Sequence, residues 1–521
     1  MGVYRFTSEY EDMRTVSFHM PGHKGSEIYR RFGFDPWLRN FPDRDITEIA
    51  GADNLFQAEG IIAETMERYR ALYDTRATYL LINGSSAGII ASIMNCAVPG
   101  EKIIMARNCH KAVYNGIRMR AIEPIYVYPE VVAEYGIAGQ VNPEDIAFAI
   151  RENSDAKAII LPSPNYYGIC SDIGAIADLA HEAGMILIVD QAHGAHLKLF
   201  EEAAQIREKE ALAAANIETT KGLRFPVSAE TAGADLIINS THKTLASMTQ
   251  SAILNVCSDR VDLFDLEDRL QMIQSTSPSY ILMESLDING YIMREHGDQL
   301  IEEWYANLMG FYHDVKYVPG LKVMRTAGMD PTKINLDMSR IGLDGAALDE
   351  ELRERGVYGE LFTGDILMCM TGIGNTRRDY ERLLKALKEI AWKYGQDLIA
   401  EMREAGGDIV SWREGMEGFE EEEIVEEVVM PELEQVASTE VHSVWTQRRE
   451  MHGVPAKKNR IPLNEAAGQI CARSLIPYPP GIPLVCPGEE ITEEDVDYVR
   501  SIRDNGGNVI GIDPEGNVSV G

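Results

Sequence analysis

Short apolar runs alternate with helical stretches along the chain from Thr78 to about Asn255. The helical stretches, such as Ala87–Ala97 and Ile173–Ala183, place apolar residues three and four positions apart. The apolar runs predict strands at Tyr79–Ile82, Lys102–Met105, Pro124–Tyr128, Ala158–Leu161, Met185–Val189, Leu236–Ile238 and Ile253–Val256. Strands separated by helices need crossover connections, so the pattern predicts an α/β fold with a mostly parallel seven-stranded sheet.

The pattern changes on both sides of this region. Residues 1–50 carry little apolar patterning, and shorter α+β pieces follow Pro319. We therefore expect an N-terminal arm at 1–50, a large domain at 51–318 and a C-terminal α+β domain at 319–521. The pieces after Pro319 predict a strand at Asp365–Met370 and helices at Arg378–Lys393 and Thr492–Asp504.

Three further segments stand out from the pattern. A long helix is expected to start within Gln274–Tyr280 and to run to about Leu308. Residues of about 200–233 are rich in Ala and Glu, which favours a surface insertion in the large domain. The acidic run over 417–434 is most simply a solvated face or loop.

Charge and cysteine usage narrow the class of protein. The net charge of −33 argues against a nucleic-acid partner, since phosphate binding needs clustered Lys and Arg. No apolar run reaches the 18 or so residues of a membrane span, so we expect no membrane partner. The seven cysteines are scattered without a C-x-x-C pair, which favours reduced thiols in the cytoplasm over a disulfide framework or a zinc site.

One polar stretch, Asn239–Gln250, follows the apolar run Leu236–Ile238 directly. Its lysine, Lys243, has Ser, Thr and His neighbours and no adjacent carboxylate. The carboxyl end of a buried strand is the usual place for a site on an α/β sheet. A lysine amine among groups that can hold a phosphate suits a Schiff base to pyridoxal phosphate (PLP), although a surface lysine after a strand would show the same pattern.

Two other strand ends supply complementary chemistry. Ser85 and Ser86 follow the first strand and open a helix, where backbone N–H groups and hydroxyls can hold a phosphate. Asp190 ends the strand Met185–Val189, and a buried carboxylate needs a cationic or donor partner. A pyridinium N–H is such a partner, because an Asp there keeps the ring protonated.

The histidines near these strand ends have alternative interpretations. His110 follows the second strand and could stack on an aromatic cofactor, or serve as a hydrogen-bonded loop residue. His193 and His196 could bind a metal together with Asp190, but no further ligand lies nearby at metal-binding spacing. We therefore predict no metal site. We favour a single cofactor whose three ends are contacted by Ser85–Ser86, Asp190 and Lys243.

These motifs resemble the PLP-dependent Orn/Lys/Arg decarboxylases, which have the aspartate-aminotransferase-like fold called fold type I. The resemblance covers most of the chain, without the amino-terminal wing domain of the long members. The matching segments are His19-Met20-Pro21-Gly22-His23-Lys24, Asn83-Gly84-Ser85-Ser86, Arg107-Asn108-Cys109-His110-Lys111, Asp190-Gln191-Ala192-His193-Gly194, Ser240-Thr241-His242-Lys243, Ser275-Thr276-Ser277-Pro278 and Pro477-Tyr478-Pro479-Pro480-Gly481-Ile482-Pro483.

The resemblance implies a role for each residue around the cofactor. Lys243 would form the Schiff base, Asp190 would pair with the pyridine nitrogen and His110 would stack on the ring. Ser85, Ser86, Ser240 and His242 would hold the phosphate, and Ala192 and His193 would lie by the ring and its phenolic oxygen. Ser275 would reach the phosphate of a neighbouring chain in a homodimer with shared sites, and a higher oligomer stays open. Gln191 departs from the acidic residue common in the short members.

The activity implied is α-decarboxylation of a small cationic amino acid, with lysine or arginine favoured and ornithine open. Lys243 or His242 would return a proton to Cα. Glu360 and Glu465 are our candidates for binding the distal cation, since a buried cation must be paired. An aminotransferase or other PLP lyase on the same fold, and a non-catalytic PLP-binding protein, are the alternatives.

Overall fold

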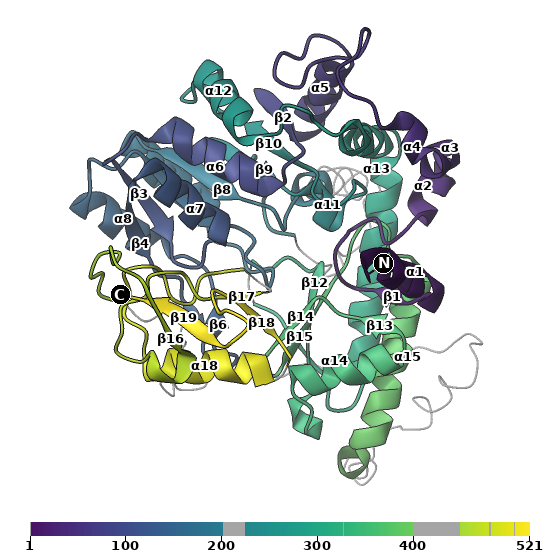
Figure 1. Cartoon of the computed structure of the whole chain (residues 1–521). Helices are drawn as coiled ribbons and strands as arrows, with labels where there is room; N and C mark the ends of the chain where they lie inside the picture. Colours follow the sequence, from purple (N-terminus) through teal and green to yellow (C-terminus); the bar gives the residue numbers. More distant parts are fainter. Residues whose placement is uncertain (1, 202–224, 327, 400–448, 479–480, 505) are drawn as a thin grey trace, which may run out of the picture.

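A computed structural model describes residues 2–201, 225–326, 328–399, 449–478, 481–504 and 506–521. A seven-stranded sheet, at the upper left of Figure 1, has the strand order β2-β10-β9-β8-β7-β3-β4. Only β10 runs in the direction opposite to the other strands of the sheet, so the predicted α/β class and mostly parallel sheet are confirmed. The strands are β2 (Ala77–Leu81), β3 (Lys102–Ala106), β4 (Glu123–Val127), β7 (Ala158–Pro162), β8 (Ile186–Asp190), β9 (Leu236–Asn239) and β10 (Ala252–Val256).

The central strands are buried along almost their whole length, which explains their continuous apolar runs. Ile159, Val189 and Ile237 have no exposed surface, as expected for parallel strands covered on both faces. Helices connect and cover them, and α6, α7 and α12 pack together as neighbours. These helices are α5 (Ile61–Tyr73), α6 (Ser85–Cys96), α7 (Lys111–Arg120), α8 (Pro143–Glu152), α9 (Ile173–Glu182), α11 (Thr241–Thr244) and α12 (Leu263–Ile273).

The long helix α13 (Tyr280–Asp314) begins at the last residue of the segment in which its start was expected, and it ends later than the sequence indicated. Ser279 caps it by accepting a hydrogen bond from the Leu282 N–H, and Pro278 disfavours a helical Ser277. The helix continues past Leu308 because Phe311 and Tyr312 are buried in the hydrophobic core that the helix shares with β12 (Lys333–Asp337).

A second, antiparallel sheet follows α13, in the order β11-β12-β15-β14. Its core also takes in Val16, Phe18 and Trp37 of the N-terminal residues. The N-terminal residues are therefore packed against this second part of the chain, where β1 pairs with β13 in parallel. The elements here are β1 (Val16–Ser17), β11 (Lys322–Met324), β12 (Lys333–Asp337), β13 (Val357–Tyr358), β14 (Leu361–Thr363), β15 (Ile366–Met370), α1 (Gly2–Met13), α2 (Glu27–Arg31), α3 (Asp35–Arg39), α4 (Phe41–Arg44), α14 (Gly345–Glu354) and α15 (Arg377–Tyr394).

The last residues form a separate small core beside the large sheet (Figure 1, yellow). Its elements are β16 (Asn459–Pro462), β17 (Ile476–Tyr478), α18 (Glu493–Asp504), β18 (Asn508–Ile510) and β19 (Asn517–Val520). The three-part division of the chain stays a prediction. Most of the predicted insertion (202–224) and the whole acidic run (417–434) lie outside the described residues. Within the described ranges, no helix is long and apolar enough to cross a membrane.

Candidate active site

A cavity of about 430 Å³ lies at the carboxyl ends of the central strands, within the size range of small-molecule sites. Residues that follow β2, β3, β7, β8 and β9 line it, because parallel strands bring their carboxyl ends to one edge of the sheet. The lining residues are Met20, Gly84, Ser85, Ser86, Asn108, His110, Pro162, Pro164, Asn165, Tyr166, Asp190, Ala192, His193, Ser240, His242, Lys243, Thr249, Glu360, Tyr478 and Ile482.

Lys243 lies in α11, the short helix that directly follows β9, and its amine faces the cavity. Its Nζ is 2.9 Å from Nε2 of His193. Loss of hydration lowers the pKa of Lys243 to about 8, against the attraction of the carboxylates of Asp190 and Glu360. A substantial fraction of the amine is therefore uncharged at mildly alkaline pH, as a nucleophile requires.

Asp190 is the last residue of β8 and is buried at the inner wall of the cavity. Its Oδ1 accepts a hydrogen bond from the Ala192 N–H at 3.2 Å. Burial raises the pKa of Asp190, and the nearby charge of Lys243 opposes that rise. The carboxylate thus lies where a ligand with a positively charged N–H would be stabilised.

Two histidines of the cavity are held in neutral forms. His110 caps α7, with its Nδ1 accepting from the Ala112 N–H at 3.2 Å. Burial lowers the pKa of His110 to about 3 and that of His242 to about 4. Nδ1 of His242 lies 2.7 Å from the carbonyl oxygen of Ser251 and must carry the proton, so its Nε2 is a hydrogen-bond acceptor.

Several polar atoms of the site are buried without a partner. Within the described residues, the hydroxyl of Ser240, Oδ1 of Asn108 and Nδ1 of His193 have no hydrogen bond. Ser85 and Ser86 open α6 beside them, so unpaired helix N–H groups also meet the cavity. Unsatisfied buried polar atoms are rare in proteins, and those that line this cavity fit a polar ligand with a phosphate group.

Glu360, which lies between β13 and β14, also lines the cavity. Its two carboxylate oxygens accept hydrogen bonds from the Met20 N–H at 2.8 Å and the Tyr166 hydroxyl at 2.7 Å. Both donors are uncharged, so they orient the carboxylate without neutralising it. Glu360 can therefore receive the cationic end of a ligand.

The structure brings together most of the predicted site residues. Ser275 and Glu465 lie elsewhere: Ser275 is exposed between α12 and α13, where its hydroxyl donates to the Ser277 carbonyl. Glu465 is exposed in a short 3-10 helix after β16. The residues that line the cavity as predicted are Ser85, Ser86, His110, Asp190, Ala192, His193, Ser240, His242, Lys243 and Glu360.

Sequence reasoning did not select some residues that line the cavity. Tyr166, which contacts Glu360, lies in a polar loop after β7 that offered only a general signal. Met20 and Tyr478 come from opposite ends of the chain, and nothing in their local sequence indicates that they meet. The other unselected lining residues are Asn108, Pro162, Pro164, Asn165, Thr249 and Ile482, whereas Gly84 belongs to the predicted phosphate-binding motif.

The two histidines after Asp190 have separate partners, which disfavours a metal site. His193 meets Lys243, whereas His196 lies 3.1 Å from Oδ2 of Asp330. In the part of the chain that the structure describes, no group of three or more His, Cys, Asp or Glu could hold a metal ion.

Comparisons with known proteins place these features in context. Residues 2–318 match the family model for the Orn/Lys/Arg decarboxylase major domain, and residues 433–516 match its C-terminal domain. The chain is 30% identical over 520 residues to an arginine decarboxylase of Bacillus subtilis (strain 168), covering 97% of this chain and 94% of that protein.

Solved structures agree at the level of the fold. Lysine decarboxylase A from Pseudomonas aeruginosa is similar with a TM-score of 0.69 at 20% identity, covering 99% of this chain and 80% of that one. Serine palmitoyltransferase of Sphingomonas wittichii is similar with a TM-score of 0.53 at 14% identity, covering 73% of this chain and 87% of that one.

Proposed function

The chain belongs to the Orn/Lys/Arg decarboxylase family of PLP-dependent carboxy-lyases, and we propose that it converts a basic amino acid to the corresponding amine and CO2. One observation carries the proposal: an amine, Lys243, and two carboxylates, Asp190 and Glu360, face a single cavity. Lys243 and Asp190 suit a cofactor, and Glu360 suits the cation of a basic side chain.

PLP is the cofactor that we propose for this cavity. Its phosphate would lie against the start of α6 and the unpaired hydroxyl of Ser240, and Asp190 would hold its ring nitrogen. When bound, PLP accepts the electron pair that is left when the bond between Cα and the carboxylate breaks. Ser85, Ser86 and His242 would also contact the phosphate, His110 would stack on the ring, and Ala192 and His193 would line it.

The protonation states favour Lys243 over His242 as the proton donor to Cα. His242 is neutral at pH 7, and its only N–H is committed to the Ser251 carbonyl. Lys243 has a pKa of about 8, so its ammonium both exists near neutral pH and releases a proton readily. We therefore assign the proton transfer to Lys243.

We propose arginine as the first substrate to test, followed by lysine and ornithine. The relative from Bacillus subtilis that is 30% identical is an arginine decarboxylase, which supports this order. The test is incubation of the PLP-loaded protein with each amino acid, with the amine and CO2 quantified. Formation of a keto acid would instead support an aminotransferase, and absence of any amine from all three would reject the proposed function.

Glu360→Gln is expected to raise KM for the basic amino acid roughly 10- to 100-fold with a smaller change in kcat. The amide keeps the shape of the side chain but cannot balance the distal cation, which is far from the bond that breaks. Glu465→Gln is the matched control, because Glu465 is exposed and does not line the cavity. A Glu360→Gln variant with unchanged KM would remove Glu360 from the substrate site.

A homodimer with shared sites is the assembly that we propose, with a higher oligomer left open. Ser275 is exposed in one chain, where a second chain could meet it. Its proposed contact with the neighbour's phosphate predicts weaker PLP binding in Ser275→Ala. Equilibrium dialysis of PLP, together with sedimentation analysis of the assembly, checks both parts.

A further inference from the structure

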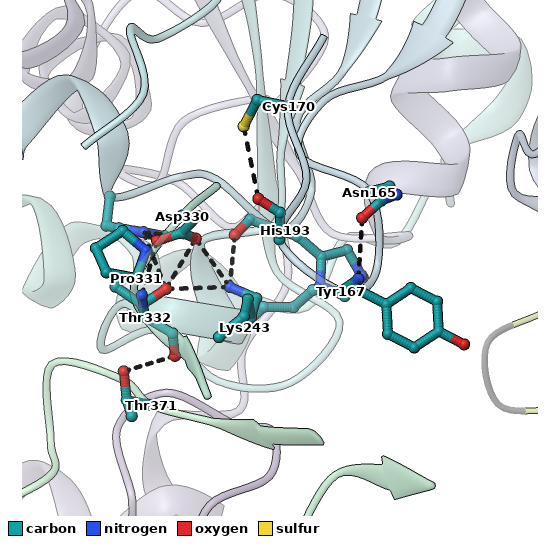
Figure 2. Close-up of polar contacts among 12 residues, drawn as sticks. Asn165, Tyr167, Cys170, His193, Lys243, Asp330, Pro331, Thr332 and Thr371 are labelled. Carbon is teal, nitrogen blue, oxygen red and sulfur yellow. Dashed lines mark hydrogen bonds and ion pairs between the residues drawn. The ribbon is translucent and has the colours of Figure 1, made fainter. Parts of the chain in front are cut away.

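A cluster of charged side chains lies outside the cavity and has no exposed surface. It consists of Asp330 and Lys333, at the start of β12, and His196, in the loop after β8. Nζ of Lys333 is 3.3 Å from Oδ2 of Asp330, and Nε2 of His196 is 3.1 Å from the same oxygen. Figure 2 shows Asp330 and Thr332 beside His193 and Lys243, so the cluster adjoins the site.

The charges within this cluster are defined by their contacts. Burial opposes ionisation of Asp330, but His196 and Lys333 together hold the pKa of Asp330 well below its ordinary value. Burial lowers the pKa of His196, which favours its neutral form. The cluster therefore contains one ionised carboxylate in contact with the imidazole of His196 and the amine of Lys333.

Lys333 also contacts the loop that carries His193. Its Nζ donates a hydrogen bond to the His193 carbonyl oxygen at 3.0 Å, and the imidazole of the same residue meets Lys243 at 2.9 Å. The chain leaves room for this arrangement at Gly168, where φ is +94° and an added Cβ would lie 2.9 Å from Cβ and Cγ of Lys333. Lys333 is thus linked to the amine of Lys243 through one intervening residue, His193.

A purely structural role accounts poorly for these charges. Buried ion pairs are weak contributors to stability, and apolar residues of similar volume often serve as well. A charged pair also supplies an electric field and a hydrogen-bond donor at a fixed position. Here the donor is Nζ of Lys333, and it contacts the carbonyl oxygen of His193. We propose that Lys333 is a positioning residue, which holds His193 against Lys243 and whose charge acts on that amine.

This inference rests on the proposed role of Lys243 and predicts how its protonation responds to the cluster. The charges that act on Lys243 are those of Asp190 of β8 and Glu360 beyond β13, which raise its pKa, and that of Lys333 of β12, which lowers it. The imidazoles of His193, His110 and His242 also face Lys243, and burial together with the charge of Lys243 lowers the pKa of each. Among all these groups, Lys333 is the buried cation, so its removal should make Lys243 harder to deprotonate.

The experiment measures the pKa of Lys243 in the apoprotein by competitive acetylation with acetic anhydride across pH, with the Lys243 peptide quantified by mass spectrometry. Lys333→Met should raise that pKa from about 8 by about half a unit, which lowers the neutral fraction roughly threefold below the pKa. Asp330→Asn leaves Lys333 unbalanced and should shift the pKa of Lys243 in the opposite direction. Shifts of opposite sign in the Lys243 pKa indicate an electrostatic effect of the cluster. A loosened loop would instead raise the Lys243 pKa in both variants, toward the ordinary value for lysine.

Arg449→Met is the matched control, because it breaks a different buried pair, with Asp495, in the C-terminal core. It should cost stability and leave the pKa of Lys243 unchanged. Shifts of the same sign in both cluster variants, no shift in either, or failure of both to fold while the control folds would overturn the proposal. Amine production by the wild-type protein tests the decarboxylase function separately, because the labelling needs neither PLP nor substrate.

Discussion

Lys243→Ala is expected to lose at least roughly 10⁴-fold in the rate of amine formation, because it removes the amine that would bind PLP and return the proton to Cα. The visible absorbance band of the PLP-loaded protein should disappear as well. Lys243→Arg should behave in the same way, since a guanidinium keeps the charge but cannot act as the nucleophile. Product assays and absorbance spectra of the two variants test these expectations.

The matched control is Lys157→Ala, which removes a lysine at the amino end of β7, where it pairs with Glu101 at 3.6 Å. That variant should keep both the band and the activity. A Lys243→Ala protein that retained more than a tenth of the wild-type rate would reject Lys243 as the catalytic amine.

The pKa of Lys243 also predicts how PLP uptake depends on pH. Below about 8 the amine is mostly protonated and unreactive, and above it the neutral form dominates. The rate at which the apoprotein binds PLP should therefore rise roughly tenfold per pH unit below this value and level off above it. Stopped-flow absorbance measures that rate, and a profile without a bend between pH 7 and 9 would contradict the assignment.

Asp190→Asn is expected to lower kcat roughly 10³-fold, with a smaller effect on KM for the substrate. The amide has nearly the shape of the carboxylate but lacks the negative charge that would stabilise a protonated ring nitrogen. Steady-state kinetics at saturating PLP separates this loss from weaker cofactor binding.

Asp235→Asn is the control for the cost of altering a buried aspartate of the same sheet. Asp235 has no exposed surface and accepts from the Leu187 N–H at 2.7 Å, at the opposite end of the strands from the cavity. This variant should lower the midpoint of thermal unfolding while kcat stays near that of the wild type. Similar kcat values for Asp190→Asn and the wild type would show that Asp190 does not act on the cofactor.

The strands of the large sheet were predictable because each is short, apolar and bounded by polar residues. The run ending in Asp190 predicted β8 almost to the residue, since a strand buried on both faces needs an unbroken apolar segment. The start of the long helix was less predictable. The polar segment before Tyr280 favours either a loop or a first helical turn, and Pro278 and the Ser279 cap decide between them.

The residues of the candidate site also differ in how far the sequence could identify them. Lys243, Asp190 and Ser85 were identified because each directly follows an apolar strand, and a parallel sheet gathers those ends on one edge. Glu360 and Glu465 were indistinguishable in the sequence, since both are carboxylates in the later part of the chain. Only the packing of the second sheet against the loop after β7 brings Glu360 to Tyr166, whereas Glu465 stays exposed.

The sequence by itself determined the order of the strands and helices, the reactive residues at the strand ends and the family resemblance, because these depend on local patterns. The tertiary structure alone decided which distant residues meet. Lys333 shows why: it is far in the sequence from both His193 and Lys243, yet it donates to the His193 carbonyl oxygen, and its charge acts on Lys243. Such coupling depends on distances in space, which no local pattern records.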